Sequence, residues 1–130
     1  MISIDQVSSD VVGEAIRIHR ELGPGLFESV YETVLAASLT RRGYPVDRQH
    51  PVAIEYDGIA FPAAFRVDLL VDKRLVVEVK SVEQLSKAHA KQVLTYLRLT
   101  RQPVGLLLNF SCVTMKDGIR RLVNDYRPQD

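Results

Sequence analysis

Several features that would narrow the class of this protein are scarce in its sequence. The chain has one cysteine, Cys112, so it cannot form an internal disulfide, and this fits a reducing cytoplasm. No apolar run approaches the roughly 20 residues that span a bilayer. The first ten residues also lack the basic and apolar segments of a signal peptide. We therefore expect a cytoplasmic protein that does not enter a membrane, with Cys112 in a structural role.

The chain also lacks an excess of charge of either sign. The chain has 17 Lys and Arg residues and 16 Asp and Glu residues, which leaves a formal net charge of +1. Proteins that coat nucleic acid without sequence preference carry a large basic excess, so this class is not expected. An enzyme that acts on nucleic acid remains open, because charge can gather on one face of a neutral protein.

Nothing in the sequence divides the chain. It has no internal repeat, low-complexity run or Pro/Gly-rich linker, and 130 residues is an ordinary length for one domain. The apolar fraction of 46% and the charged fraction of 25% are typical of globular proteins. We expect a single domain that covers residues 1–130.

Two helices are predicted before any strand. The first starts after one of residues 8–10, which are Ser, Ser and Asp and make good N-caps, and it ends at the breaker cluster 22–25. The second covers about residues 26–42, has apolar residues at helical spacing, and stops at Gly43.

Strands and one more helix fill the rest of the chain. Apolar alternation and turn signals predict three strands, a helix, a buried strand and a short terminal hairpin. They cover residues 46–56, 59–71 and 75–80, then 87–100, then 104–110, and last 113–116 with 119–123. Pro62 predicts a bend or a sheet edge near the start of the second strand. The order indicates an α/β domain with a mixed central sheet and helices on its faces.

An acid stands in a strand that is otherwise apolar on both faces. Residues 75–80 read Leu-Val-Val-Glu-Val-Lys, so alternation places Glu78 and Lys80 on one face of a central strand. On the preceding strand, alternation predicts that Asp68 shares a face with residues 66 and 70, and that Val67 shares the other face with residues 69 and 71.

The turn between these strands decides whether the two acids meet. A three-residue turn over 72–74 pairs Val71 with Leu75, which places Asp68 opposite Glu78. A two-residue turn would break the apolar pattern on both strands, so the three-residue register is preferred.

Like charges directly opposed in a sheet are destabilising, so the pair needs an explanation. One is a pair of solvent-facing acids near a strand end, balanced by Arg66 and Lys80. The other is a divalent cation between Asp68 and Glu78, since carboxylates, water and a substrate phosphate suit Mg²⁺. Lys80 on the same face would then reach a phosphate or the attacking water, which is a set for metal-assisted phosphodiester hydrolysis.

The acidic pattern resembles that of a known superfamily. Asp68, nine intervening residues and then Glu78-Val79-Lys80 resemble the D-(x)n-(D/E)-x-K signature of the PD-(D/E)XK nucleases. One departure is Val67, which stands where the signature has proline. The fold that this resemblance implies is a restriction-endonuclease-like core in αβββαβ order, here with an extra N-terminal helix and a C-terminal hairpin.

Two further motifs extend the resemblance, which covers about residues 11–124. Gly25, Glu28 and Tyr31 match the G-x-x-E-x-x-Y motif that names a small bacterial and archaeal family within the superfamily. Gln92 and Tyr96 have the spacing of the Q-x-x-x-Y element of RecB-type nucleases. Residues 103–110 resemble the terminal core strand of the same family.

The resemblance implies a role for each residue of the acidic pattern. Asp68 and Glu78 would be metal ligands, with the carbonyl of Val79 as a third, and Mg²⁺ would be the cofactor, with Mn²⁺ as a substitute. Lys80 would orient or activate the nucleophilic water and stabilise the transition state.

Four supporting residues have a plainer alternative. Glu28 would be a further catalytic ligand or act through water, because an unpaired acid is costly on the helix face that it shares with Tyr31 and Leu35; alternatively, it is an ordinary exposed glutamate. Gln92 and Tyr96 would contact Lys80, water or phosphate; alternatively, they are a polar neighbour and a core aromatic. Tyr31 would support the site or only anchor its helix.

The function implied is a Mg²⁺-dependent nuclease that acts on DNA in repair, defence or mobile-element processing. Nucleic acid, most simply DNA, would be its partner, and a homodimer would allow both strands to be cut. The alternative is a nuclease-fold module that binds nucleic acid or protein with weak or no turnover.

Overall fold

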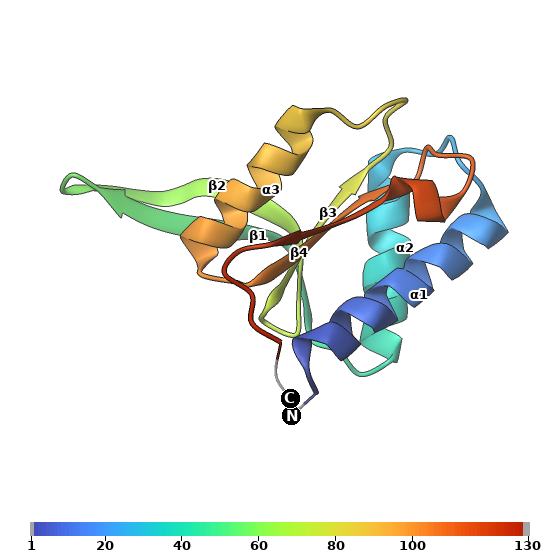
Figure 1. Ribbon diagram of the computed structural model, residues 1–130, viewed down its shortest axis with the longest axis horizontal. Helices are drawn as coiled ribbons and strands as arrows, with labels where there is room; N and C mark the ends of the chain where they lie inside the picture. Colours follow the sequence, from blue (N-terminus) through green and yellow to red (C-terminus); the bar gives the residue numbers. More distant parts are fainter. Residues whose placement is uncertain (1, 129–130) are drawn as a thin grey trace.

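The computed structural model describes residues 2–128 and confirms most of the predicted elements (Figure 1). Two helices come first, three strands follow, and a helix and two more strands complete the chain. Their bounds are α1 Ile4–Leu22, α2 Glu28–Arg41, β1 Val46–Tyr56, β2 Ile59–Val71, β3 Leu75–Lys80, α3 Lys87–Thr100, β4 Val104–Asn109, the 3₁₀ turn η1 Met115–Gly118, and β5 Ile119–Val123.

The strands form one mixed sheet in the order β1-β2-β3-β4-β5. Neighbouring strands are antiparallel except β3 and β4, which are parallel and are joined by the crossover helix α3. Helices α1 and α2 cover one face of the sheet, and α3 covers the other (Figure 1). This is the predicted α/β architecture.

Two apolar clusters hold the layers together. The cluster under α1 and α2 contains Leu35 and Val77, and the cluster under α3 contains Val93 and Leu97. Gly105 of β4 permits the close approach of α3, because a β-carbon there would lie only 3.0 Å from Val93 Cγ1. Strands β3 and β4 are buried along nearly all of their length, as expected of central strands.

The predicted start of the first helix was wrong. Helix α1 begins at Ile4, and Ser3 is its N-cap, with Ser3 Oγ accepting from the Gln6 amide at 3.1 Å. Ser8, one of the predicted caps, is buried inside the helix instead, next to the core residue Val7. The apolar face extends through Val7 to Ile4, about two turns further toward the N-terminus than the sequence interpretation assumed, and its burial carries the helix past the later capping residues.

Only one of the two strands predicted for the C-terminal hairpin forms, because β5 matches the predicted strand 119–123. Residues 113–116 form no strand; β5 instead returns along β4, with Leu108 paired to Ile119. The turn before β5 packs tightly against the end of β4, because a β-carbon on Gly118 would lie 2.1 Å from the carbonyl oxygen of Asn109. A residue with a side chain could not make this turn.

The outer halves of β1 and β2 form a hairpin that extends beyond the body of the domain (Figure 1). Its tip is apolar yet exposed: Tyr56 and Ile59, which pair across the strands, are 75% and 57% exposed. The register shifts beside Pro62, where residues 62–64 of β2 stand opposite the single residue Ala53. The irregularity predicted at Pro62, a bend or a sheet edge, is thus seen as a register shift of β2 against β1.

Candidate active site

The pairing of β2 with β3 confirms the predicted register. Val71 pairs with Leu75 and Leu69 with Val77, so the connecting turn is residues 72–74. Asp72 and Lys73 take positive φ values of 55° and 62° to make it. The regular ladder ends at Leu69 and Val77, and the next residue on each strand is an acid, Asp68 or Glu78.

The predicted alternation of β2 fails at Asp68. Val67 packs in the cluster under α3, together with Leu70, whereas Leu69 packs in the cluster under α1 and α2. Val67 and Leu69 therefore lie on opposite faces, although strict alternation would place them on the same face. The neighbouring strand is irregular at the same level, since Gln49 of β1 has a φ of 48° between the paired residues Arg48 and His50.

The two carboxylates stand where ladder bonds between the strands would otherwise be. The Asp68 amide donates to Glu78 Oε1 at 3.0 Å, and the Val79 amide donates to Asp68 Oδ2 at 2.9 Å. Each strand thus gives one backbone donor to the acid of the other. The two carboxylates therefore meet between β2 and β3, as the turn length predicted.

Burial controls the charge of this pair. Glu78 is only 4% exposed, and burial, followed by the negative charge of Asp68, raises its pKa to about 8. The half-buried Lys80 opposes this shift, because its positive charge favours the ionised carboxylate. Without a cation, Glu78 therefore holds a proton at neutral pH while Asp68 accepts two hydrogen bonds.

The donor set fits a hard divalent cation. Within residues 2–128, no three His, Cys, Asp or Glu side chains converge on one point. Asp68 and Glu78 would be the two carboxylate ligands, and the remaining positions would fall to a backbone carbonyl, water and substrate phosphate. Mg²⁺ accepts such sites because it keeps several waters and needs only one or two carboxylates.

The Glu28 side chain lies beyond the end of β3, beside Ser81, which is the residue that follows Lys80. It is the first residue of α2, and its Oε1 accepts from the Ser81 amide at 3.3 Å. It is exposed, whereas Tyr31 and Leu35 are fully buried, so the expectation that Glu28 lies within their apolar stripe was wrong. With Phe27 it lines an open depression of about 580 Å³.

Tyr31 anchors the loop that precedes α2. Its hydroxyl donates to the Gly23 carbonyl at 2.6 Å and accepts from the Leu26 amide at 3.1 Å. Its ring stacks on Phe110 at a centroid distance of 4.4 Å. Tyr31 therefore fixes the start of α2, and with it the position of Glu28.

The two residues of the Q-x-x-x-Y element differ in their surroundings. Tyr96 of α3 stacks on Phe65 of β2 at 4.2 Å, and its pKa is raised by burial and then by the charges of Glu78 and Asp68. It therefore lies near the acids, on the α3 side of the sheet. Gln92 is exposed, and its side chain makes no hydrogen bond within the described part of the chain.

Sequence reasoning missed the residue that fixes the segment after Lys80. Asn109 is only 1% exposed; its Oδ1 accepts from the Val82 amide at 3.1 Å, and its Nδ2 donates to the Val82 carbonyl at 2.9 Å. The available signal was a single amide at the end of an otherwise apolar strand. Asn109 ties the ends of β3 and β4 together beside the site.

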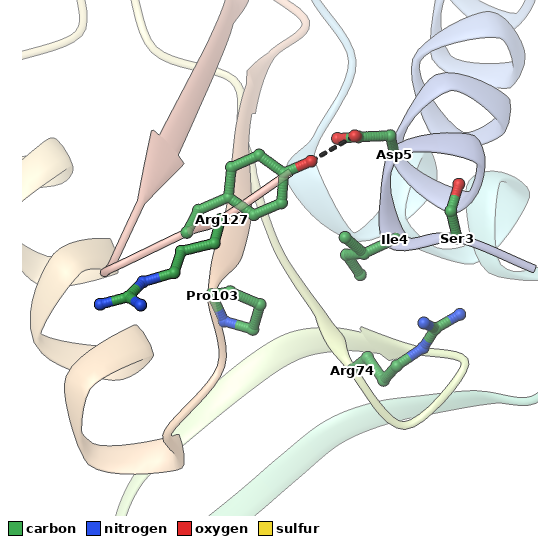
Figure 2. Close-up of a pocket in the computed structure, with 7 residues that line it drawn as sticks. Ser3, Ile4, Asp5, Arg74, Pro103 and Arg127 are labelled. Atoms are coloured by element: carbon green, nitrogen blue, oxygen red, sulfur yellow. Dashed lines mark hydrogen bonds between the residues drawn. The ribbon is translucent and has the colours of Figure 1, made fainter. Parts of the chain in front are cut away.

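A smaller hollow of about 230 Å³ lies elsewhere, between the start of α1 and the C-terminal segment (Figure 2). Arg74 and Pro103 line it, and they stand before β3 and β4, at the opposite end of these strands from Lys80. Tyr126 donates to Asp5, which also pairs with Arg121 at 2.7 Å. These contacts fasten the C-terminal segment to α1 and involve none of the candidate site residues.

A mixed sheet with helices on both faces, and with an acid pair and a lysine on its inner strands, defines a restriction-endonuclease-like fold. A family model described as the PD-(D/E)XK nuclease superfamily matches residues 5–122, and the chain belongs to this superfamily. No curated protein and no solved structure matched the chain. No helix within residues 2–128 is both long and apolar enough to cross a membrane.

Proposed function

We propose that this protein is a Mg²⁺-dependent nuclease that hydrolyses phosphodiester bonds of DNA. The observation that carries the proposal is the acid pair between β2 and β3, where Asp68 and the buried Glu78 accept hydrogen bonds from each other's strand. Superfamily membership supports the same class of reaction. Gly25, Glu28 and Tyr31 lead us to place the chain in the G-x-x-E-x-x-Y family within it.

Each residue of the acidic pattern has a distinct task in this proposal. Asp68 and Glu78 would hold the cation, with the carbonyl of Val79 beside them. A bound Mg²⁺, or Mn²⁺ in its place, would supply Lewis acidity and lower the pKa of bound water. Glu78 would give up its proton on cation binding, because a divalent charge outweighs the burial that raises its pKa to about 8.

Lys80 would act on the phosphate and the attacking water. It is half-buried and follows Glu78 by two residues on the same strand, which places both on one face. A positive charge there stabilises the negative charge that develops on the phosphoryl oxygens in the transition state. Glu28, at the rim beside Ser81, and the hydroxyl of Tyr96 would contact water or substrate, and the exposed Gln92 would contact the nucleic acid.

Assembly and cellular role are part of the same proposal. One small domain carries one acid pair, so cleavage of both strands of a duplex would need two copies, and we propose a homodimer. A cytoplasmic enzyme of DNA repair, defence or mobile-element processing is consistent with the single Cys112 and the near-neutral charge.

The test is cleavage of single- and double-stranded DNA by purified protein with Mg²⁺ or Mn²⁺, compared with EDTA. We expect cleavage by the wild type and a loss of at least 100-fold in Lys80→Ala, in line with the loss of one transition-state contact. Lys116→Ala, an exposed lysine of η1, is the matched control and should cleave like the wild type. Equal activity of the wild type and Lys80→Ala would contradict the proposal.

Calorimetry separates the enzyme from a nuclease-fold module without turnover. The enzyme should bind Mn²⁺ in a way that is lost in Asp68→Ala and should also cleave DNA. A protein that binds DNA but neither binds the cation nor cleaves would be a module, and the proposed activity would then be wrong.

A further inference from the structure

Gln49 has an unusual backbone conformation for a strand residue. Its φ of 48° lies in the left-handed region, although it is neither glycine nor part of a turn, and β1 continues on both sides of it. Such a conformation is strained for a residue with a side chain and persists only where the surroundings hold it. The contacts of Gln49 show what holds it.

The side chain of Gln49 bridges two acids from different elements. Its Nε2 donates to Glu32 Oε1 of α2 at 2.6 Å and to Asp68 Oδ1 of β2 at 3.2 Å. The amide group has two N–H donors, one for each carboxylate. The reversed amide would place its oxygen against two acceptors, so the donor orientation is the one that fits.

Glu32 is itself held in place by its partners. It is 7% exposed, and its Oε2 accepts from Arg48 Nη2 at 3.0 Å. The same Arg48 nitrogen also donates to Thr33 Oγ1 at 2.9 Å, which ties β1 to α2 a second time. A buried carboxylate is retained when it is paired in this way, and it provides a strong, immobile acceptor for Gln49.

The bridge completes the set of bonds that orient Asp68. One oxygen of Asp68 accepts from the Val79 amide and the other from Gln49, so both ends of the carboxylate are held. Both donors come from the protein, so the orientation of the carboxylate does not depend on a cation. Hydrogen bonds of this kind raise metal affinity because the ligand need not be reoriented on binding.

We propose that Gln49, held by Glu32 and Arg48, is a positioning residue that orients Asp68 toward a divalent cation. The inference rests on the proposed function, since it assigns Asp68 the role of a ligand. It also accounts for the backbone of Gln49: the left-handed conformation lets one side chain reach both α2 and Asp68.

The test is Gln49→Gly, because glycine adopts a positive φ without strain. The variant should keep the fold, with a melting temperature equal to or above that of the wild type, while it loses the bridge. Its Mn²⁺ affinity, measured by titration calorimetry, should fall about 10- to 100-fold, the usual loss when a hydrogen-bond partner of a metal ligand is removed. A structural role alone would lower the melting temperature and leave the affinity unchanged.

Arg101→Gly is the matched control. Arg101 also has a positive φ, 58°, but it caps α3 away from the acids, so this variant should gain the same backbone relief and bind Mn²⁺ like the wild type. Glu32→Gln is a second variant at the other end of the bridge. It keeps the size of Glu32 and removes the charge that holds Gln49, so its affinity should also fall.

The outcomes distinguish this inference from the proposed function. A wild type that neither binds Mn²⁺ nor cleaves DNA would contradict the function itself. A wild type that does both, with Gln49→Gly and Glu32→Gln binding Mn²⁺ equally well, would overturn the positioning role and leave the function standing. If Gln49→Gly unfolds, wild-type affinity in folded Glu32→Gln would overturn the inference by itself.

Discussion

Replacement of Glu78 by glutamine should stabilise the protein at neutral pH when no divalent cation is present. Glu78 is almost fully buried, and its pKa rises from 4.5 to about 8 on folding. Because the pKa of Glu78 is higher in the folded than in the unfolded state, Glu78 loses its proton at a lower pH when the chain is unfolded. The contribution of Glu78 to stability is therefore fully present below pH 4.5 and is lost as the pH rises to about 8.

The magnitude follows from the size of this shift. Each pH unit between the two pKa values of Glu78 lowers the free energy of unfolding by about 1.4 kcal/mol. At pH 7 the loss is therefore about 3 kcal/mol. Glutamine does not ionise, yet its side-chain oxygen can still accept from the Asp68 amide, as Glu78 Oε1 does. We expect Glu78→Gln to be more stable than the wild type by up to this amount at pH 7, and to differ little at pH 4.5.

Urea unfolding followed by circular dichroism, in EDTA and at half-unit steps from pH 4.5 to 9, measures the difference. The difference in the free energy of unfolding between Glu78→Gln and the wild type should increase up to about pH 8 and then stay constant. A gap that does not change with pH, or a variant less stable than the wild type at pH 7, would refute the reasoning. Added Mg²⁺ should raise the stability of the wild type and leave Glu78→Gln nearly unchanged, because only the wild type offers the second carboxylate.

Two further predictions concern helices α1 and α2. The pKa of Glu14 is lowered to about 2, mainly because its carboxylate accepts a hydrogen bond from the Ser38 hydroxyl. The contribution of Glu14 to stability is therefore present above pH 4.5 and is lost as the pH falls toward 2. Glu14→Gln should therefore unfold with a weaker dependence on pH in this range, as measured by acid titration of the circular dichroism signal. Tyr31→Phe keeps the ring on Phe110 but loses the hydrogen bonds to Gly23 and Leu26, so urea unfolding should show a loss of about 1–3 kcal/mol; an unchanged stability would contradict the anchoring role.

The meeting of Asp68 and Glu78 could be predicted from the sequence because apolar residues surround each of them. A one-residue slip would move a whole set of valines and leucines to the wrong face, so the register had only one acceptable value. Apolar patterns also predicted α3 and β4. Ser86 marks the start of α3, and Pro103 separates α3 from β4. Local pattern and tertiary packing agree in these segments.

The break at Gln49 and Asp68 could not be predicted in this way. Alternation assumes a regular strand, and here β1 and β2 are both irregular at one level. At that level Gln49 contacts Glu32, seventeen residues earlier in the sequence, and no local pattern encodes this contact. Glu28 was misplaced for a similar reason, since helical spacing alone does not show that the first residue of α2 lies outside its buried stripe.

The exchange of backbone donors between β2 and β3 also makes the site observable. The amides of Asp68 and Val79 donate to carboxylate oxygens of the opposite strand. Any ligand that withdraws electron density from these oxygens must shift both amide resonances together. The signals of these two amides in a ¹⁵N-labelled sample would thus report occupancy of the site directly, before any substrate is chosen. The same two signals would allow the binding of different metal ions to be compared.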